Sequence, residues 1–258
     1  MKKYLTLFII LLLVGCSNDK AATDNAVKAD VSNQFFEPLQ AQEEDASLSG
    51  EYAYYIDSYT SQVLPKEDAD PEIVLLTFDD APDTYALQIA KTLKENNAPA
   101  IFFVNGMFLE EDGGKEMLKE IYDMGFEIGN HTQTHPSLDS LNDEETEYEM
   151  KETNRLVEEV IGKKPRFFRA PFGINTEKSL EIAEEEGMTV MNWTFGYDWE
   201  PEYQEKDALA DIMVNNEFLA DGANLLMHDR EWTNAALPEI LSGLQEKGFS
   251  FVDPKNIE

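Results

Sequence analysis

The length, composition and charge of the chain already limit what it can be. It has 258 residues, of which 42% are hydrophobic and 11% aromatic, enough to fill a sizeable core, so a wholly disordered chain is excluded. Acidic residues outnumber basic ones by 52 to 20, and the formal net charge of −32 repels phosphate backbones, which argues against nucleic acid as a partner. The single cysteine excludes an intrachain disulfide and a cysteine-based zinc site.

The first sixteen residues account for that cysteine. Lys2 and Lys3 form a basic start, and the apolar run 5–14 has the length of a signal-peptide core but is too short to span a bilayer. The sequence Leu-Val-Gly-Cys that ends at Cys16 resembles the bacterial lipobox. The resemblance implies cleavage of residues 1–15, a lipid on Cys16, and attachment to the extracytoplasmic face of a cell membrane.

Two segments lie between this start and the first strong structural pattern. Residues 16–50 are rich in small and polar side chains without sustained periodicity, and we interpret them as a flexible tether. Residues 51–70 contain several tyrosines, and we interpret them as an adaptor strand or turn that packs on the domain. The remaining residues, 71–258, form the predicted catalytic domain.

From residue 71 onward, apolar runs of strand length alternate with segments of helical periodicity. In the longest predicted helix, Met150, Thr153 and Val157 follow the spacing of one buried stripe, and Asn142 can cap its start. The predicted strands are 73–78, 101–104, 126–128, 167–168, 188–193, 224–227 and 249–252. The predicted helices are 84–96, 115–124, 143–161, 176–186, 207–219 and 235–247.

Strict alternation of strands and helices indicates an α/β fold with parallel strands joined by right-handed crossovers. The segment 71–258 is short for eight strand–helix repeats. A shortened or distorted β/α barrel therefore fits best, and an open doubly wound sheet is the alternative.

Residues able to do chemistry follow the predicted strands directly. All three histidines of the chain, His131, His135 and His228, do so. In a parallel barrel the loops after the strands share one face, which carries the active site. The same placement applies to five further residues, which are Asp79, Asp80, Arg169, Asp198 and Trp199.

Two of the histidines have the spacing of metal ligands. His131 and His135 are four residues apart, a spacing found in many zinc sites, although two spaced histidines alone are equally consistent with structural roles. A hydrolytic zinc site usually has a third protein ligand and keeps its fourth position open for water. Asp79 and Asp80 can provide the carboxylate. Taken alone, two adjacent aspartates in so acidic a chain are more typical of a helix cap or a solvent-facing surface.

At this point five motifs, in order and over residues 71–254, resemble the polysaccharide deacetylases with a NodB-type domain, carbohydrate esterase family 4. The match is highly specific because all five occur with plausible gaps. The motifs are Thr77-Phe78-Asp79-Asp80, His131-Thr132-Gln133-Thr134-His135-Pro136, Arg169-Ala170-Pro171-Phe172-Gly173, Asp198-Trp199 and Leu226-Met227-His228. The stretch 193–199 looks most like the muramic-acid deacetylase subgroup, although that subgroup often lacks the second aspartate, which this chain keeps as Asp80.

The resemblance implies a distorted (β/α)7 barrel, a divalent metal that is usually Zn²⁺ (Co²⁺ or Ni²⁺ being other options), and a role for each matching residue. The implied metal ligands are Asp80, His131 and His135. The implied catalytic residues are Asp79 as general base, His228 as general acid, Arg169 to orient Asp79, and the amide N–H of Phe172 to bind the oxyanion. Substrate binding would fall to Trp199, Leu226, Pro171 and Asp198, with Leu226 and Trp199 lining the pocket for the acetyl methyl.

Amide hydrolysis needs such a set of groups whatever the family. A bound zinc lowers the pKa of its water to about 7 and polarises the carbonyl. A nearby carboxylate that accepts the proton of the water raises the rate by roughly 10²–10⁴. The departing amine must be protonated, and His228 is the histidine that remains for this, with an ordinary pKa of about 6.5.

These patterns predict a lipid-anchored, zinc-dependent deacetylase of N-acetylated cell-wall sugars, with N-acetylglucosamine or N-acetylmuramic acid of peptidoglycan as the substrate. Two departures from the family, Ala81 in place of glycine and Phe195 in place of an aspartate that tunes the acidic histidine, favour a second hypothesis. It is a non-catalytic surface lipoprotein that binds glycan or zinc. If the first hypothesis holds, Asp198 either substitutes for the missing aspartate or leaves His228 untuned. Two histidines and one carboxylate are also the ligands of non-haem iron oxygenases, a third option.

Overall fold

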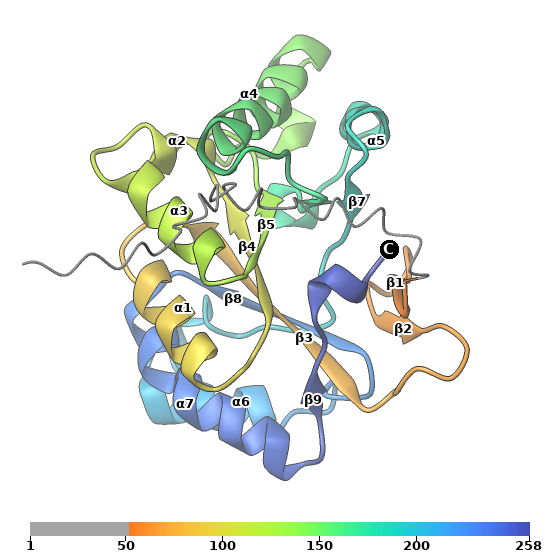
Figure 1. Ribbon diagram of the computed structural model, residues 1–258, viewed down its shortest axis with the longest axis vertical. Coiled ribbons are helices and arrows are strands. Elements are labelled where there is room, and N and C mark those ends of the chain that lie inside the picture. The colour runs from red at the N-terminus through yellow and green to blue at the C-terminus, as the bar shows by residue number, and fades with distance from the viewer. Residues whose placement is uncertain (1–51) are drawn as a thin grey trace, which may run out of the picture. The chain divides into compact units, whose positions relative to one another are not determined.

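Strand β3 (Ile73–Ala81) is the central element of the fold, which we describe from a computed structural model for residues 52–258 (Figure 1). Its first six residues, Ile-Val-Leu-Leu-Thr-Phe, are all buried, as expected of a strand that is covered on both faces. It pairs in parallel with β4 (Ala100–Val104) on one side and with β8 (Ala223–His228) on the other. The two neighbours carry the longest apolar runs after β3 itself.

The sheet has seven strands, all parallel. Its order is β7, β6, β5, β4, β3, β8, and β9 pairs with the start of β3. The remaining bounds are β5 Glu127–Asn130, β6 Phe167–Phe168, β7 Thr189–Val190 and β9 Ser250–Phe251. Each lies within a residue or two of a predicted strand, except that β7 is shorter than the predicted 188–193.

The sheet curls so far that its two edges meet beyond β7. There the chain continues irregularly and pairs with β8, because Thr194 N–H donates to Asn224 O and Leu226 N–H donates to Phe195 O, both at 2.9 Å. The predicted distorted barrel is therefore confirmed, and in the described part of the chain the open doubly wound sheet is not observed. The short β7 is the distortion, because the chain leaves the ladder with β6 after Met191 and reaches β8 at Thr194 and Phe195.

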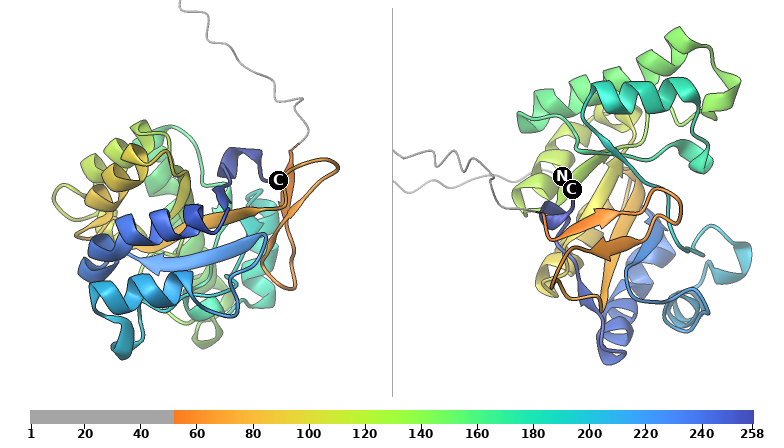
Figure 2. Two further views of the ribbon diagram at one scale, coloured as in Figure 1. Left: turned by 90° about the horizontal axis from the view of Figure 1, so that it is seen from below. Right: turned by 90° about the vertical axis from the view of Figure 1, so that its right-hand side faces the viewer.

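Helices surround the curled sheet (Figures 1 and 2). Around it, neighbouring helices contact one another in the order α6, α7, α1, α3, α4, α5. Their bounds are α1 Ala86–Glu95, α3 Gly114–Asp123, α4 Asp143–Ile161, α5 Glu177–Glu185, α6 Lys206–Val214 and α7 Glu231–Glu246, and a single turn, α2 Gly106–Leu109, was not predicted. The capping box of Asn142 and Glu145 at the start of α4 is present as the sequence indicated.

Two helix ends differ from the prediction. Helix α6 ends at Val214, and the Asn216 side chain then accepts the N–H of Phe218, which is a turn rather than a further helical bond. Helix α7 begins at Glu231, four residues earlier than predicted, because Arg230 already has the extended backbone of an N-cap residue. Among residues 52–258, no helix has both the length and the hydropathy to cross a membrane.

Two short strands precede the barrel. Strands β1 (Tyr54–Ile56) and β2 (Val63–Pro65) pair antiparallel within the segment interpreted as an adaptor. Tyr54 and Val63 belong to the apolar cluster inside the barrel, and Val63 N–H donates to Gly222 O at 2.8 Å. The hairpin thus packs against the interior cluster of the barrel. The predicted signal peptide, the lipidated Cys16 and the tether lie outside the described residues.

Candidate active site

The alternation of side chains along the strands selects which residues enter the barrel. On β3, Val74, Leu76 and Phe78 pack in the outer core beneath the helices, whereas Ile73 and Leu75 pack in the inner cluster. Asp79 continues the inner series. The same rule places on the inner face the residues that follow inward-facing positions of β5, β6 and β8, which are His131, Arg169, Leu226 and His228.

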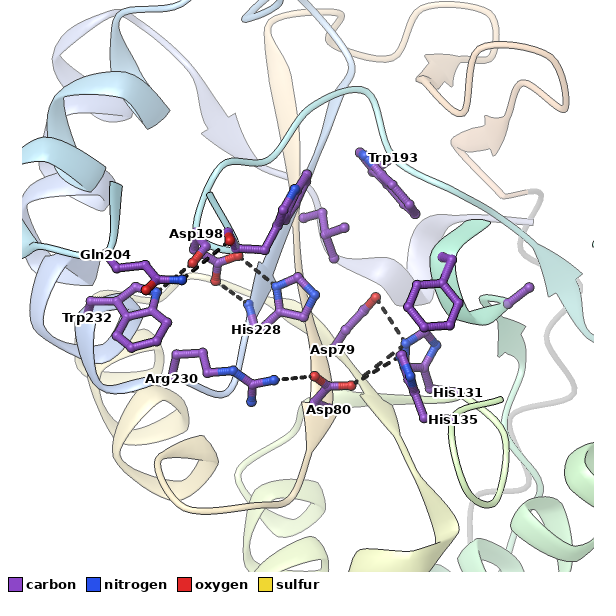
Figure 3. A pocket seen from close by; sticks show the side chains of 14 residues that line it. Asp79, Asp80, His131, His135, Trp193, Asp198, Gln204, His228, Arg230 and Trp232 are labelled. Atoms are coloured by element: carbon purple, nitrogen blue, oxygen red, sulfur yellow. Dashed lines mark hydrogen bonds and ion pairs between the residues drawn. The ribbon is translucent and has the colours of Figure 1, made fainter. Parts of the chain in front are cut away.

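These side chains gather at the carboxyl end of the barrel around a cavity of about 500 Å³ (Figure 3). Asp79, Asp80, His131, His135 and His228 all line it, although they come from positions up to 149 residues apart. The convergence inferred from the strand ends is thus what the structure shows. The roles of the individual residues are taken up below.

A local distortion of β3 brings Asp80 into the cavity beside Asp79. Regular alternation would turn Asp80 outward, but the pairing of β3 with β4 shifts register between Phe78 and Ala81, and Asp80 has a left-handed φ of 58°. Ala81 is not among the residues with positive φ, so the alanine that stands where the family commonly has glycine carries no such strain. Ala81 therefore causes no backbone strain and no longer supports the hypothesis of a non-catalytic protein.

Asp79 is held by a buried arginine. Arg169 Nη1 donates to Asp79 Oδ1 at 2.7 Å and to Thr77 Oγ1 at 2.8 Å, and its Nη2 donates to Asn192 O at 2.8 Å. The guanidinium also lies 4.3 Å from the ring centre of Phe103. Burial lowers the pKa of Arg169, and the charge of Asp79 opposes that shift. Arg169 is fully buried and does not line the cavity, so its guanidinium acts on a ligand through Asp79 and not by direct contact.

The two histidines predicted to bind the metal, His131 and His135, lie on a loop after β5 that is held by several hydrogen bonds. Thr132 N–H donates to Asn130 Oδ1 at 2.8 Å, and His135 N–H donates to Thr132 Oγ1 at 3.2 Å. Glu149 of α4 accepts both the N–H and the hydroxyl of Thr134, at 2.7 and 2.6 Å. Thr132 and His135 both have positive φ, 69° and 59°, and these bonds hold them there.

Asp80, His131 and His135 bring three ligand atoms together. Asp80 Oδ1 lies 4.0 Å from His131 Nε2 and 3.6 Å from His135 Nε2, and the ligand atoms of the three residues all lie within 4.8 Å of one another. Two imidazole nitrogens and one carboxylate oxygen are a donor set that Zn²⁺ uses in hydrolytic sites.

The environment of His131 suits it to bind a cation. Its Nδ1 lies 2.7 Å from Arg169 O, a carbonyl that can only accept, so Nδ1 carries the proton. The lone pair of Nε2 is then left for the cation site, where Asp79 Oδ2 lies 3.5 Å away and Asp80 Oδ1 4.0 Å away. Burial lowers the pKa of His131, against the opposing charges of Asp79 and Asp80, and keeps the ring neutral as a metal ligand must be. For Asp80, burial raises the pKa, but charge interactions with the protonated forms of the three histidines and with Arg230 outweigh burial and lower it, which favours the ionised carboxylate.

His228 lies on the other side of the cavity and is bound to Asp198. Its Nδ1 lies 2.7 Å from Asp198 Oδ1, and its backbone N–H donates to Asp198 Oδ2 at 2.6 Å. Burial lowers the pKa of His228, but the charge and hydrogen bond of Asp198 outweigh burial and raise it above 6.5. Asp198 therefore pairs with His228 and raises its pKa, so His228 has a carboxylate partner although Phe195 stands where the family often has an aspartate.

Two of the predicted substrate-binding residues are buried. Asp198 lines the cavity, but it is fully buried and both of its oxygens are bonded, to His228 and Thr233, so its contacts in the structure are those of a residue that positions His228. Pro171 is buried in the 3-10 turn Pro171–Gly173 and does not line the cavity, whereas its neighbour Phe172 is exposed and does.

The cavity walls are mostly aromatic. Trp199 stands edge-on to His228, with ring centres 5.7 Å apart, and Phe172 stands edge-on to His135 at 4.9 Å. Leu226 lies between them on the inner face of β8 and is almost fully buried. Trp199, Phe172 and Leu226 thus all line the cavity, as the sequence indicated.

Four lining residues with side chains long enough to contact a ligand were not predicted: Trp193, Gln204, Arg230 and Trp232. Trp232 Nε1 donates to Asp198 O at 2.7 Å, and Arg230 Nη2 lies 2.6 Å from Asp80 Oδ2. The available signal was their closeness in sequence to predicted site residues, since Arg230 and Trp232 follow His228 by two and four positions.

Comparison with known proteins agrees with the geometry. The family model described as polysaccharide deacetylase matches residues 66–191. A peptidoglycan-N-acetylglucosamine deacetylase of Bacillus cereus is 33% identical over 190 residues, which cover 70% of this chain and 68% of that protein. The peptidoglycan-N-acetylmuramic acid deacetylase PdaC of Bacillus subtilis is 32% identical over 204 residues, 76% of this chain and 41% of PdaC. Among solved structures, a family 4 carbohydrate esterase from Streptomyces lividans in complex with acetate superposes with a TM-score of 0.64 at 27% identity, covering 71% of this chain and 93% of the esterase.

Proposed function

Because this chain belongs to the polysaccharide deacetylase family, we propose that it is a metal-dependent hydrolase that removes acetyl groups from N-acetylated cell-wall sugars. The observation that carries the proposal is the convergence of Asp79, Asp80, His131, His135 and His228 on one cavity. A carboxylate beside a cation site and a histidine opposite are the groups that amide hydrolysis requires.

The metal of this hydrolase would be held by Asp80, His131 and His135. We propose Zn²⁺, which accepts two imidazoles and a carboxylate and leaves room for water and substrate; Co²⁺ or Ni²⁺ would fit the same donors. When bound, such an ion lowers the pKa of a water ligand and polarises the acetamide carbonyl. The neutral ring of His131 and the ionised Asp80 are in the protonation states that metal binding needs.

Proton transfer falls to the groups on either side of the cation site. Asp79 is the general base, and its bond to buried Arg169 fixes the direction of its free oxygen. His228 is the general acid that gives a proton to the departing amine, and Asp198 favours the protonated ring it needs for this. Figure 3 shows Asp79 beside Asp80 and the histidine pair, and His228 on the side of the cavity where Asp198 lies.

The remaining cavity residues bind the acetamide. Leu226 and Trp199 provide an apolar wall for the acetyl methyl. The backbone N–H of Phe172 is the proposed donor to the oxyanion, a contribution worth roughly 3–4 kcal/mol for one such donor in other hydrolases. The exposed ring of Phe172 offers an apolar face to a sugar.

Peptidoglycan is the substrate that we favour. The relatives named above act, by their names, on N-acetylglucosamine or N-acetylmuramic acid of peptidoglycan. Peptidoglycan is also the N-acetylated polymer nearest to a protein anchored outside a bacterial membrane. Both sugars carry the acetamide for which the cavity provides the reacting groups.

The anchoring is a proposal from the sequence. The lipobox-like sequence that ends at Cys16 predicts cleavage after residue 15, a lipid on Cys16, and a place on the extracytoplasmic face of the cell membrane. Metabolic labelling with a tagged fatty acid should mark the unaltered protein and not the variant Cys16→Ala. Label on both proteins, or on neither, would contradict the proposal.

Acetate release tests the enzymatic function directly. The protein should release acetate from peptidoglycan or chitooligosaccharides, and both a metal chelator and Asp79→Asn should abolish the release. Zn²⁺ returned to the chelated protein should restore it. Full activity in chelator, or in Asp79→Asn, would refute the mechanism.

The non-catalytic alternative has lost its two supports. Ala81 does not occupy a strained backbone position, and Asp198 is bonded to His228. A protein that only binds zinc has no use for a base at Asp79 with its own buried arginine. Acetate release in the absence of molecular oxygen would exclude the third option, a non-haem iron oxygenase.

A further inference from the structure

Arg230 is the one lysine or arginine among the residues that line the cavity within the described part of the chain. Its Nη2 donates to Asp80 Oδ2 at 2.6 Å. In Figure 3 it approaches Asp80 from the side opposite to His131 and His135. A cation so close to a predicted metal ligand needs an explanation, because it would repel a bound metal ion unless its charge is already matched.

The two oxygens of Asp80 have different partners. Oδ1 faces both histidines, at 4.0 Å from His131 Nε2 and 3.6 Å from His135 Nε2. Oδ2 is bonded to Arg230. One carboxylate thus bridges the arginine and the cation site through separate atoms, and the charge of Arg230 is matched by the oxygen that does not face the histidines.

The guanidinium of Arg230 is held in place by hydrogen bonds of the neighbouring residue, Asp229. Arg230 Nη1 donates to Asp229 O at 2.9 Å, and Asp229 N–H donates to Asp79 O at 3.0 Å. The Asp229 carboxylate accepts the backbone N–H groups of Asp83 and Tyr85 at 2.7 and 2.5 Å. The segment after β8 is therefore bonded to the chain on both sides of Asp80, to β3 before it and to the loop between β3 and α1 after it, and this sets the direction from which Arg230 approaches.

We propose that Arg230 is a positioning residue that makes Asp80 a ligand through one oxygen. With Oδ2 bonded to Arg230, Oδ1 alone is free to bind the cation. A carboxylate without this partner can bind through both oxygens and fill a coordination position that a hydrolytic site must leave open for water and substrate. The inference rests on the proposed metal site.

Metal affinity tests the inference without reference to turnover. Zn²⁺ alone is titrated against a chromophoric chelator in the metal-free protein and in Arg230→Met, Arg230→Lys and Arg155→Met. Arg155 is an exposed arginine of α4, paired with Glu152 and Glu159 away from the cavity, and it is the matched control. Thermal unfolding of each metal-free variant checks that it is folded.

We expect Arg230→Met to bind Zn²⁺ about 10- to 100-fold more weakly, the usual cost of removing a group that orients a metal ligand. Arg230→Lys should recover part of the affinity, because its ammonium can still donate to Oδ2, and Arg155→Met should match the unaltered protein. With Co²⁺, Arg230→Met should show weaker visible absorption, since a second carboxylate oxygen raises the coordination number.

Unchanged affinity and an unchanged Co²⁺ spectrum in Arg230→Met would overturn the inference and leave the proposed function intact. Tighter Zn²⁺ binding by Arg230→Met would overturn it as well, because Arg230 would then act only as a repelling charge. Failure of the unaltered protein to bind Zn²⁺ would instead overturn the proposed metal-dependent function itself.

Discussion

The Asp198 carboxylate accepts from His228 twice, once from the ring Nδ1 at 2.7 Å and once from the backbone N–H at 2.6 Å. The bonds fix both the position of His228 and its tautomer, so Nε2 is the nitrogen left to serve the cavity. Thr233 of α7 donates to the same carboxylate at 2.7 Å, and Asp198 itself is fully buried. A loop that follows β7 and a strand end at β8 thereby act as one unit.

This contact predicts a change in the pH dependence of activity in Asp198→Asn. The general acid must be protonated, so activity falls as the pH rises through the pKa of His228, which Asp198 holds above 6.5. In Asp198→Asn the charge that raises this pKa is gone, and the alkaline limb of kcat against pH should move to lower pH. The acidic limb should move less, because Asp198 does not contact the residues of the proposed metal site.

Acetate release measured across the pH range provides the check. Asp211→Asn, which removes a carboxylate from the surface of α6, is the control and should leave both limbs in place. An alkaline limb that does not move in Asp198→Asn would show that His228 does not set it.

The buried pair of Arg169 and Asp79 predicts a loss of stability. Arg169→Met leaves Asp79 buried without its ionic partner, and breaking a buried pair in this way typically costs roughly 3–5 kcal/mol of unfolding free energy. Urea unfolding of the metal-free protein measures the change. The double variant Arg169→Met/Asp79→Asn should recover part of it, because the unpaired charge is then gone.

If the double variant were as unstable as the sum of the two single variants, the ion pair would not be the cause. The loss would then belong to the other contacts of Arg169, with Thr77, Asn192 and the ring of Phe103.

The proposed metal site predicts that Zn²⁺ stabilises the folded protein, and that this effect requires His135 but not His228. A ligand at 100 times its dissociation constant stabilises the folded state by about 2.7 kcal/mol, so Zn²⁺ should raise the Tm of the unaltered protein and a chelator should reverse the rise. His135→Ala removes a ligand and should abolish most of the increase. His228→Ala should keep the increase while it lowers the rate of acetate release by about 10²–10⁴, the contribution of a general acid.

Differential scanning calorimetry of the two variants, with and without Zn²⁺, measures the change in Tm and distinguishes these outcomes. Equal loss of the Zn²⁺ effect in His135→Ala and His228→Ala would mean that the two histidines are not divided between metal binding and proton transfer as proposed.

Strand periodicity explains why much of the site could be predicted. Asp79, His131, Arg169 and His228 each continue the inner face of a strand whose apolar residues are visible in the sequence, and parallel strands bring these ends together. Nothing more than alternation and order along the chain was required for that step.

Other features of the site depend on contacts that alternation does not contain, and this holds for Asp80, which motif resemblance predicted, as well as for Arg230, which was not predicted. Asp80 enters the cavity through a shift of register and a positive φ, and Arg230 reaches it across 150 positions of sequence. The resemblance left open whether Asp198 contacts the substrate or serves His228, because its burial depends on how an irregular loop folds against α7. Each of these rests on long-range geometry, which a local pattern does not encode.

Ala81 provides a test of the backbone at this distorted strand end. If the position required a left-handed backbone, Ala81→Gly would relieve strain and stabilise the protein. Ala81 is instead the buried last residue of β3 and is not in the positive-φ set, so glycine only adds flexibility to the unfolded chain and removes a packed methyl group. We therefore expect Ala81→Gly to lower the unfolding free energy by about 0.5–1 kcal/mol or somewhat more.

The control is Asp80→Gly, at the position where φ is 58°. Glycine there should gain stability because the backbone strain is relieved, and it should lose stability because the bond to Arg230 is removed. Stabilisation by Ala81→Gly in urea unfolding would mean that this alanine, and not Asp80, bears the strain at the strand end.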